Sequence, residues 1–186
     1  MLRQLVTWCS QGESTRLFTI VAAHGSSPRP VGSMMACVSG GRRIGSISGG
    51  CVEDDLLERL EAGEFDLPLP QLVKYGISAK ENSRLGLPCG GRLTLLVQKL
   101  DQGDRIWLEE VLQAVEDRRC LIRTLDLGTG LCTLQPSDHY EPLLLTPSRL
   151  RQCFGPRMRM LLVGAGELAR NLAELGLAMN YEVIVT

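Results

Sequence analysis

The feature that most constrains the fold is the pattern at the C-terminal end of the sequence. An apolar run over 158–163 leads into the glycine turn Gly164-Ala165-Gly166, a helical pattern continues to about residue 180, and a second apolar run covers 182–186. A strand, a glycine turn, a helix and a second strand predict a βαβ unit, which implies a parallel sheet. We therefore predict the first unit of a Rossmann domain over 158–186.

This predicted unit lacks what a nucleotide site needs. A dinucleotide site requires an acidic residue at the end of the second strand, where this sequence ends at Thr186. One βαβ unit also cannot cover both faces of its own sheet. We expect either a truncated form of a longer protein, which we favour, or a partial domain that packs against another subunit or a neighbouring domain. A nucleotide is expected to bind only in a full-length form.

The preceding region alternates irregularly between strand and helix patterns. Strands are predicted over 17–23, 33–38, 43–47, 71–75, 91–98, 120–127 and 131–134, and amphipathic helices over 1–8, 52–60 and 104–117. The fold class is therefore α/β, with a mixed-sheet domain over 1–135. Four prolines (136, 142, 147 and 156) predict a linker with one short strand over 136–157.

Charge, hydropathy and cysteine spacing exclude several classes of protein. The 20 basic residues nearly balance the 21 acidic ones, so no nucleic-acid footprint is indicated. Apolar runs stay shorter than the ~18 residues of a membrane span, and we expect a cytoplasmic protein without a membrane partner. The seven cysteines are dispersed and form no CxxC pair, which disfavours a zinc site. Cys37, Cys120 and Cys132 lie in apolar strand patterns typical of the core.

The turn Ser48-Gly49-Gly50-Cys51 delivers a cysteine to the start of a predicted helix. A helix N-terminus favours the thiolate form of such a cysteine, and its free backbone N–H groups suit a phosphate. The two glycines allow a ligand to approach the backbone closely. The alternative interpretation is a tight helix entry with a buried cysteine.

Two further loops carry candidate ligand groups. Cys89-Gly90-Gly91 repeats the local chemistry of the first turn, and the alternative interpretation is a plain loop before a strand. Ser26, Ser27 and Arg29 form a short loop that could hold a phosphate or a carboxylate, while Arg29 could equally be a surface charge. His24 could act as a general base, but a lone histidine at the end of an apolar strand is more often structural.

Three motifs together resemble one known family. Gly25-Ser-Ser-Pro-Arg-Pro-Val-Gly-Ser-Met-Met35, Gly45-Ser-Ile-Ser-Gly-Gly-Cys-Val-Glu53 and Leu87-Pro-Cys-Gly-Gly91 occur in the order and at the spacing of the XdhC/CoxI family. The resemblance is strong over about residues 10–100. The proline-rich segment and the Leu161-Leu-Val-Gly-Ala-Gly166 turn also match the start of that family's Rossmann domain. Many members carry a histidine where this chain has Glu167, so any role of that histidine cannot be transferred.

The resemblance implies an accessory protein of molybdenum hydroxylases such as xanthine dehydrogenase, rather than an enzyme. Such proteins bind the molybdenum cofactor (molybdopterin), hold it while a cysteine desulfurase supplies its sulfido ligand, and deliver it to the apo-hydroxylase; a homodimer is also implied. By resemblance, Cys51 and Cys89 would contact the molybdenum or its sulfur, and the glycine turns and Arg29 would receive the phosphate or pterin. The predicted cofactor-binding residues are Ser26, Ser27, Arg29, Ser48, Gly49, Gly50, Cys51, Cys89, Gly90, Gly91, Gly164 and Gly166.

An oxidoreductase is the alternative from another class. It would be either NAD(P)-dependent or a thiol redox protein that uses Cys51 and Cys89. The first needs a whole dinucleotide-binding fold, and the second usually has closely spaced cysteines. The sequence shows neither, so the cofactor carrier is the preferred prediction.

Overall fold

The computed structural model describes residues 1–25, 29–76, 91–179 and 181–186. Within them, the helical elements are α1 (Leu2–Ser10), α2 (Cys51–Glu61), the 3-10 turn η1 (Gln102–Asp104), α4 (Arg105–Glu116) and α5 (Glu167–Ala178). The strands are β1 (Thr15–His24), β2 (Met34–Val38), β3 (Arg43–Gly45), β4 (Gln71–Tyr75), β5 (Arg92–Leu100), β6 (Cys120–Asp126), β7 (Cys132–Ser137), β8 (Leu144–Leu145), β9 (Arg149–Phe154), β10 (Met158–Leu162) and β11 (Tyr181–Val185). The predicted α/β class is confirmed.

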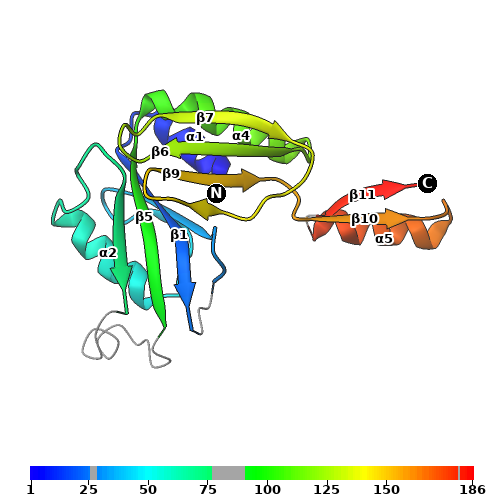
Figure 1. Ribbon diagram of the computed structural model, residues 1–186, viewed down its shortest axis with the longest axis horizontal. Coiled ribbons are helices and arrows are strands. Elements are labelled where there is room, and N and C mark those ends of the chain that lie inside the picture. Colours follow the sequence, from blue (N-terminus) through cyan, green and yellow to red (C-terminus); the bar gives the residue numbers. More distant parts are fainter. Residues whose placement is uncertain (26–28, 77–90, 180) are drawn as a thin grey trace.

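The larger sheet has five strands in the order β3-β2-β1-β5-β4, with every neighbouring pair antiparallel. Helix α2 covers one face, where Val52 and Leu56 pack against Phe18, Tyr75 and Leu95 in one buried cluster. Figure 1 shows α2 beside β4 and β5. Since alternate residues of a strand face opposite sides, this packing fixes which residues of β4 and β5 point away from α2.

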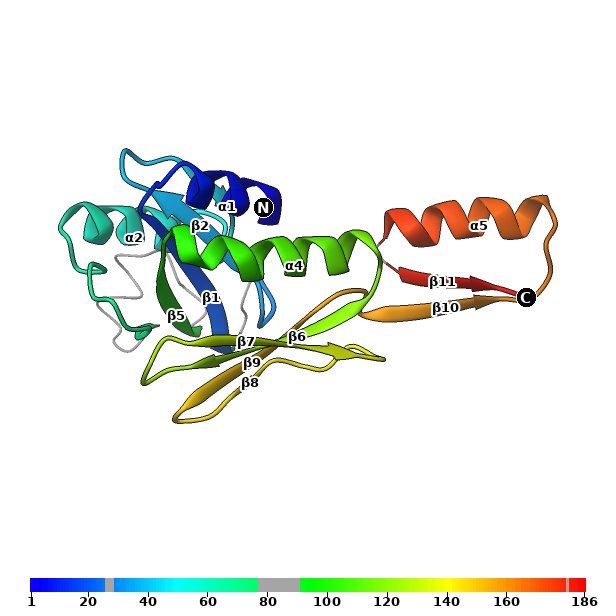
Figure 2. The same cartoon turned by 90° about the horizontal axis from the view of Figure 1, so that it is seen from above.

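The opposite face of this sheet packs against a second layer. Helices α1 and α4 share a buried cluster with Leu17 of β1 and Leu100 of β5, which also includes Leu121 and Phe154 of the smaller sheet. That sheet is antiparallel with the order β7-β6-β9-β8. Figure 2 shows α4 lying along it. The mixed sheet predicted for the N-terminal region is thus replaced by two antiparallel sheets, and the parallel pairing is confined to β10 and β11.

The segment 136–157 is not the linker that its prolines predicted. It completes β7 and contains β8 and β9, and β9 pairs with β6 along its whole length. Leu150, Cys153 and Phe154 are buried there. The prolines are compatible with this sheet because Pro136 lies on the edge strand β7, where a missing N–H group is tolerated.

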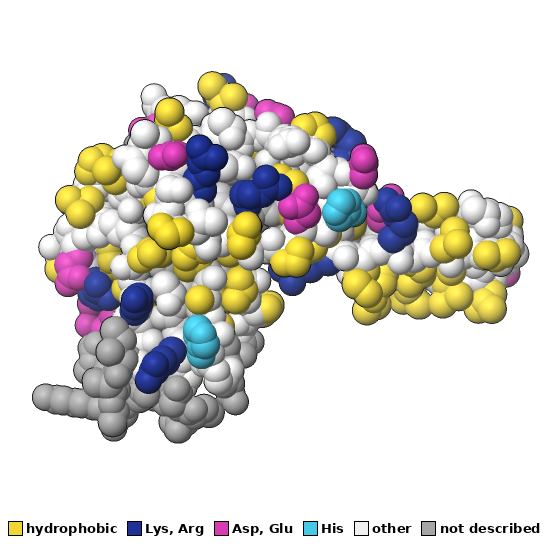
Figure 3. Space-filling model, in the orientation of Figure 1, with side chains coloured by type: hydrophobic (Ala, Val, Ile, Leu, Met, Phe, Trp, Pro, Cys, Tyr) yellow, Lys and Arg dark blue, Asp and Glu magenta, His cyan; other side chains and the backbone are white. Residues whose placement is uncertain are grey.

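The C-terminal residues form the predicted βαβ unit. β10 and β11 pair in parallel, with Met158 opposite Tyr181, and α5 connects them. Figures 1 and 2 both show this unit projecting away from the two sheets. Its apolar side chains are largely open to solvent, as the yellow atoms of Figure 3 show, and they include Val163, 85% exposed, and Leu168, 72% exposed. In the described part of the chain, no helix is long and apolar enough to cross a membrane.

Candidate functional site: a carboxylate-locked turn and a basic pocket

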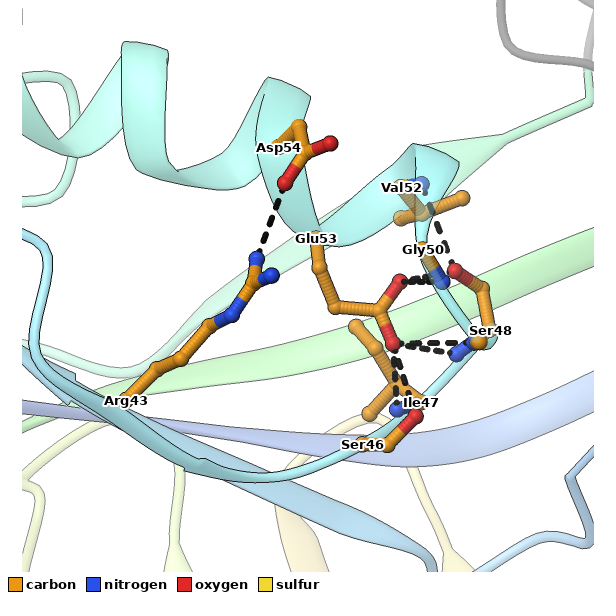
Figure 4. Close-up of polar contacts among 9 residues, drawn as sticks. Arg43, Ser46, Ile47, Ser48, Gly50, Val52, Glu53 and Asp54 are labelled. Atoms are coloured by element: carbon orange, nitrogen blue, oxygen red, sulfur yellow. Dashed lines mark hydrogen bonds and ion pairs between the residues drawn. The ribbon is translucent and has the colours of Figure 1, made fainter.

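The turn before α2 is organised by one buried carboxylate, that of Glu53. Its Oε1 accepts hydrogen bonds from the backbone N–H groups of Ile47 (3.0 Å), Ser48 (2.8 Å) and Gly49 (3.0 Å) and from Ser46 Oγ (2.9 Å). Its Oε2 accepts from the Gly50 N–H (3.1 Å) and from Ser48 Oγ. Figure 4 shows the turn wrapped around this carboxylate. Glu53 therefore fixes the path of the chain into the helix.

The hydrogen bonds also decide the ionisation of Glu53. Burial alone would raise the pKa of this carboxyl group, since the side chain is 3% exposed. The donors from Ser48, Ile47 and Gly49 outweigh burial and hold the pKa of Glu53 well below its usual range. The carboxylate is thus ionised at neutral pH and supplies the negative charge that the turn binds.

This arrangement corrects one sequence-based interpretation. By resemblance, the glycine turn was predicted to receive the phosphate or pterin of the cofactor, but the backbone N–H groups of Ser48, Gly49 and Gly50 all donate to Glu53. The turn is held by an anion of the protein itself. Gly49 and Gly50 have φ values of +90° and +151°, which L side chains rarely adopt, and a Cβ at either would meet no atom within 4 Å. Glycine is therefore required by backbone conformation rather than by crowding.

Helix α2 begins at Cys51, directly after this turn. Glu53 and Asp54 lie in its first turn, and the Val52 N–H donates to Ser48 Oγ. The main chain of Cys51 is therefore held between the turn that binds the Glu53 carboxylate and a regular helix. The expected position of a cysteine at a helix start agrees with the backbone of the structure, whereas its role in a ligand site stays a prediction.

A pocket of about 650 Å³ lies where β1 and β4 end and β5 begins. It is lined by His24, Gly25, Lys74, Tyr75, Arg92, Leu93 and Thr94. Three of these side chains are basic, and no acidic side chain is among the described lining residues. The arrangement suits an anionic ligand group of moderate size.

Tyr75 connects this pocket to α2. Its hydroxyl donates to Asp55 Oδ2 at 2.6 Å and accepts from Arg59 Nη1 at 3.0 Å. Burial and the hydrogen bond to Asp55 raise the pKa of Tyr75, so the phenol stays neutral. Asp55 lies one helical turn after Cys51. The start of α2 is therefore coupled, through Asp55 and Tyr75, to the wall of the pocket.

The predicted site residues fall in three groups. Ser26, Ser27, Cys89 and Gly90 lie outside the described residues, and of Cys51 only the main chain is described. Arg29 is exposed in the loop after β1, and Gly91 is buried immediately before Arg92 of the pocket. Gly164 and Gly166 form the turn between β10 and α5, in the projecting unit. Gly25 of the first motif and Gly91 of the third lie at the same end of the larger sheet, beside the paired residues His24 and Arg92, and the glycines of 164–166 belong to a separate unit.

Other cysteines of the described chain have the surroundings of core residues. Cys37 and Cys120 are buried as expected, while Cys132 is half-buried. Burial raises the pKa of the Cys37 thiol to about 12 and that of Cys9 to about 11. Across the described ranges, no group of three histidine, cysteine or acidic side chains is placed to hold a metal ion.

Sequence reasoning missed the residues that build this site. Glu53 entered the sequence analysis only as the last residue of the second motif. A glutamate three positions after the helix-capping residue is nevertheless the signature of a side chain that reaches back to the turn. Lys74 and Arg92 carried no local signal. They meet His24 only because β5 pairs with β1 and β4 pairs with the other edge of β5.

Two antiparallel sheets, a βαβ unit and a glycine–cysteine turn bound to Glu53 define an α/β protein. The model of the XdhC and CoxI family matches residues 8–75. This match bears out the resemblance to that family that the three motifs predicted. The matched segment contains the first two motifs, and the third motif follows it.

Known proteins extend this similarity along the chain. It is 27% identical to a probable xanthine dehydrogenase subunit from Bacillus subtilis (strain 168), over 94% of this chain and 59% of that protein. It is 28% identical to the molybdenum cofactor insertion chaperone PaoD of Escherichia coli (strain K12), over 98% of this chain and 55% of that protein. The chain therefore spans little more than half the length of these relatives.

One solved structure shows the same fold. A crystal structure described as a xanthine dehydrogenase from Bacillus halodurans superposes with a TM-score of 0.66 at 21% identity, covering 99% of this chain and 61% of the other. At this level of identity the likeness concerns the fold alone.

Proposed function

We propose that the protein is an accessory protein of molybdenum enzymes that binds the molybdenum cofactor as cargo. In this proposal it holds the cofactor while a cysteine desulfurase supplies the sulfido ligand, and then inserts it into an apo-hydroxylase of the xanthine dehydrogenase type. The match of residues 8–75 to the XdhC and CoxI family model and the similarity to a molybdenum cofactor insertion chaperone support this function. The protein would work in the cytoplasm as a homodimer and without catalytic turnover of its own.

The observation that carries the proposal is the locked turn before Cys51. Four backbone N–H groups and two hydroxyls converge on Glu53, so the first residue of α2 has a fixed backbone position. A cysteine at a helix N-terminus favours the thiolate form. Thiolates are soft ligands that suit a metal in a sulfur-rich environment. A fixed backbone position suits a residue that is to hold a reactive metal centre without being consumed.

A cofactor that brings its own sulfur ligands needs only one or two contacts from the protein. We propose Cys51 and Cys89 for these contacts, with Ser26, Ser27, Arg29 and Gly90–Gly91 on the neighbouring loops. A role of Gly164 and Gly166 toward a nucleotide in a longer form is likewise a proposal.

Cofactor retention by cysteine variants tests this function. The purified chain is incubated with molybdenum cofactor and desalted, and bound pterin is measured by fluorescence after oxidation. We expect the wild type and Cys132→Ser to retain pterin and Cys51→Ala to lose most of it. Cys132 is a matched control because it is a half-buried thiol on β7, which belongs to the smaller sheet. Equal retention by Cys51→Ala and the wild type would contradict the proposed role of this thiol.

A further inference from the structure

We propose that the pocket formed by His24, Lys74 and Arg92 is a phosphate-binding site. Only the identity of the ligand rests on the proposed function: the group bound here would be the terminal phosphate of the cofactor. The pocket itself is defined by the fold, because its basic residues come from three different strands of the larger sheet.

The register of the sheet brings the three basic residues together. His24 of β1 is the direct partner of Arg92 on β5, and Lys74 of β4 is the direct partner of Thr94, two residues further along β5. Arg92 and Thr94 lie on the same face of β5, since residues two apart share a face. Their neighbours Leu93 and Leu95 point to α2 on the opposite side. The basic side chains therefore belong to one face of the sheet, away from the buried cluster under α2.

This grouping is unfavourable for the protein alone. Basic side chains on directly paired or diagonal positions of a sheet repel one another. Within the described ranges, neither Lys74 nor Arg92 forms an ion pair with a carboxylate, whereas Arg59, beside Tyr75, pairs with Glu64 at 2.8 Å. An anion bound between Lys74 and Arg92 would remove this repulsion.

The donors also match the chemistry of a phosphate group. A guanidinium can bind two phosphate oxygens at once, an ammonium provides a point charge, and the Thr94 hydroxyl can donate a further hydrogen bond. The pocket of about 650 Å³ leaves room for the group that carries the phosphate. The glycine turn before α2 does not compete for this role, because the N–H groups of Ser48, Gly49 and Gly50 are already bound to Glu53.

The pocket is lined from both faces of the sheet. Tyr75 lines it and donates to Asp55 of α2, whereas its neighbour Lys74 faces away from α2. The pocket therefore lies at the end of the sheet, and its basic side chains come from the face opposite to α2.

The test measures phosphate binding by the whole chain with calorimetry at constant ionic strength. The probes are inorganic phosphate, glycerol phosphate as a phosphate monoester, and sulfate as a charge control. The variants are Lys74→Gln and Arg92→Gln, with Lys99→Gln as the matched control, because Lys99 is an exposed lysine at the far end of the same strand β5. Two separate pocket variants are used so that a folding defect in one leaves the other informative.

We expect the wild type and Lys99→Gln to bind glycerol phosphate equally, and each pocket variant to bind it about tenfold more weakly, the effect of one lost charge-assisted contact. Tighter binding of the monoester than of inorganic phosphate would identify a phosphate ester rather than free phosphate as the ligand. Absence of phosphate binding by the wild type, or unchanged binding by both pocket variants, would overturn the proposal.

Pterin retention, measured on the same proteins, separates this proposal from the proposed function. Phosphate binding that is lost in the pocket variants, in a chain that never retains pterin, would refute the cofactor function and leave the phosphate site standing. Pterin retention that is unaffected by Arg92→Gln and Lys74→Gln would refute the assignment of this pocket to the phosphate of the cofactor and leave the cofactor function standing.

Discussion

Replacing Glu53 by glutamine tests whether one carboxylate holds the turn before α2. The substitution preserves the size of the side chain and one acceptor oxygen. The second oxygen becomes an NH₂ group, which faces the Gly50 N–H and Ser48 Oγ, the two groups that donate to Oε2 in the wild type. The serine hydroxyl can rotate, but the backbone N–H group cannot. The two charge-assisted hydrogen bonds to Oε2 are lost, and the new NH₂ group faces the Gly50 N–H, which is also a donor.

The expected loss of stability follows from these contacts. A hydrogen bond to a charged group contributes about 1.5–3 kcal/mol, so Glu53→Gln should lower the free energy of unfolding by about 3 kcal/mol at pH 7. Asp54→Asn is the matched control, because Asp54 is the next residue and its carboxylate is 71% exposed in an ion pair with Arg43. An exposed pair of this kind contributes about 0.5 kcal/mol. The measurement is urea unfolding monitored by circular dichroism.

The stability difference between the wild type and Glu53→Gln should also depend on pH, in a direction set by the pKa of Glu53. Because the folded-state pKa of Glu53 lies below its ordinary value of 4.5, its contribution is fully present above that value and is lost as the pH falls below it. The difference in stability between the wild type and Glu53→Gln should therefore be largest near pH 7 and shrink below about pH 4.5. A variant that is no less stable than Asp54→Asn, or a difference that grows toward acid pH, would refute the role assigned to this carboxylate.

Two further predictions concern a glycine and the buried thiols. Gly76→Ala should destabilise the fold by more than about 2 kcal/mol, because φ is +84° and the new Cβ would overlap the Gly91 carbonyl oxygen; Gly40→Ala, with φ of +85° and no atom within 4 Å, should cost only the backbone strain of about 1 kcal/mol. Equal unfolding midpoints for the two variants would contradict the close approach of the chain after β4 to the chain before β5. Cys9 and Cys37, whose pKa values burial raises to about 11 and about 12, should resist alkylation at pH 8 in the native protein and react only in urea. Peptide mapping by mass spectrometry checks this, and rapid native labelling of Cys37 would show that β2 is not buried as described.

Much of the fold could be predicted from local sequence patterns. The strand patterns over 71–75 and 120–127 and the helical pattern over 104–117 correspond closely to β4, β6 and α4. These elements have a clear hydrophobic period and distinct boundaries, so short-range information is sufficient. β9 was missed because the four prolines of 136–156 outweighed its apolar residues, although Leu150 and Phe154 are both buried.

The candidate site was predictable only where its residues are close in sequence. The Ser48–Cys51 turn carried a local signal, but its N–H groups were assigned to an external anion because a sequence does not show that Glu53 folds back onto them. The basic pocket joins residues 24, 74 and 92, which meet through antiparallel register. Register depends on the pairing of whole strands, so no motif search would have brought these residues together.

The most direct test of the central claim is the stoichiometry of molybdenum and pterin on the purified chain. The chain is loaded with molybdenum cofactor and separated by size-exclusion chromatography, and molybdenum, pterin and protein are quantified across the same peak. The proposed function predicts that molybdenum and pterin elute together with the protein in nearly equimolar amounts. Elution of both with the small molecules, with the protein peak empty, would contradict the claim that this chain carries the cofactor.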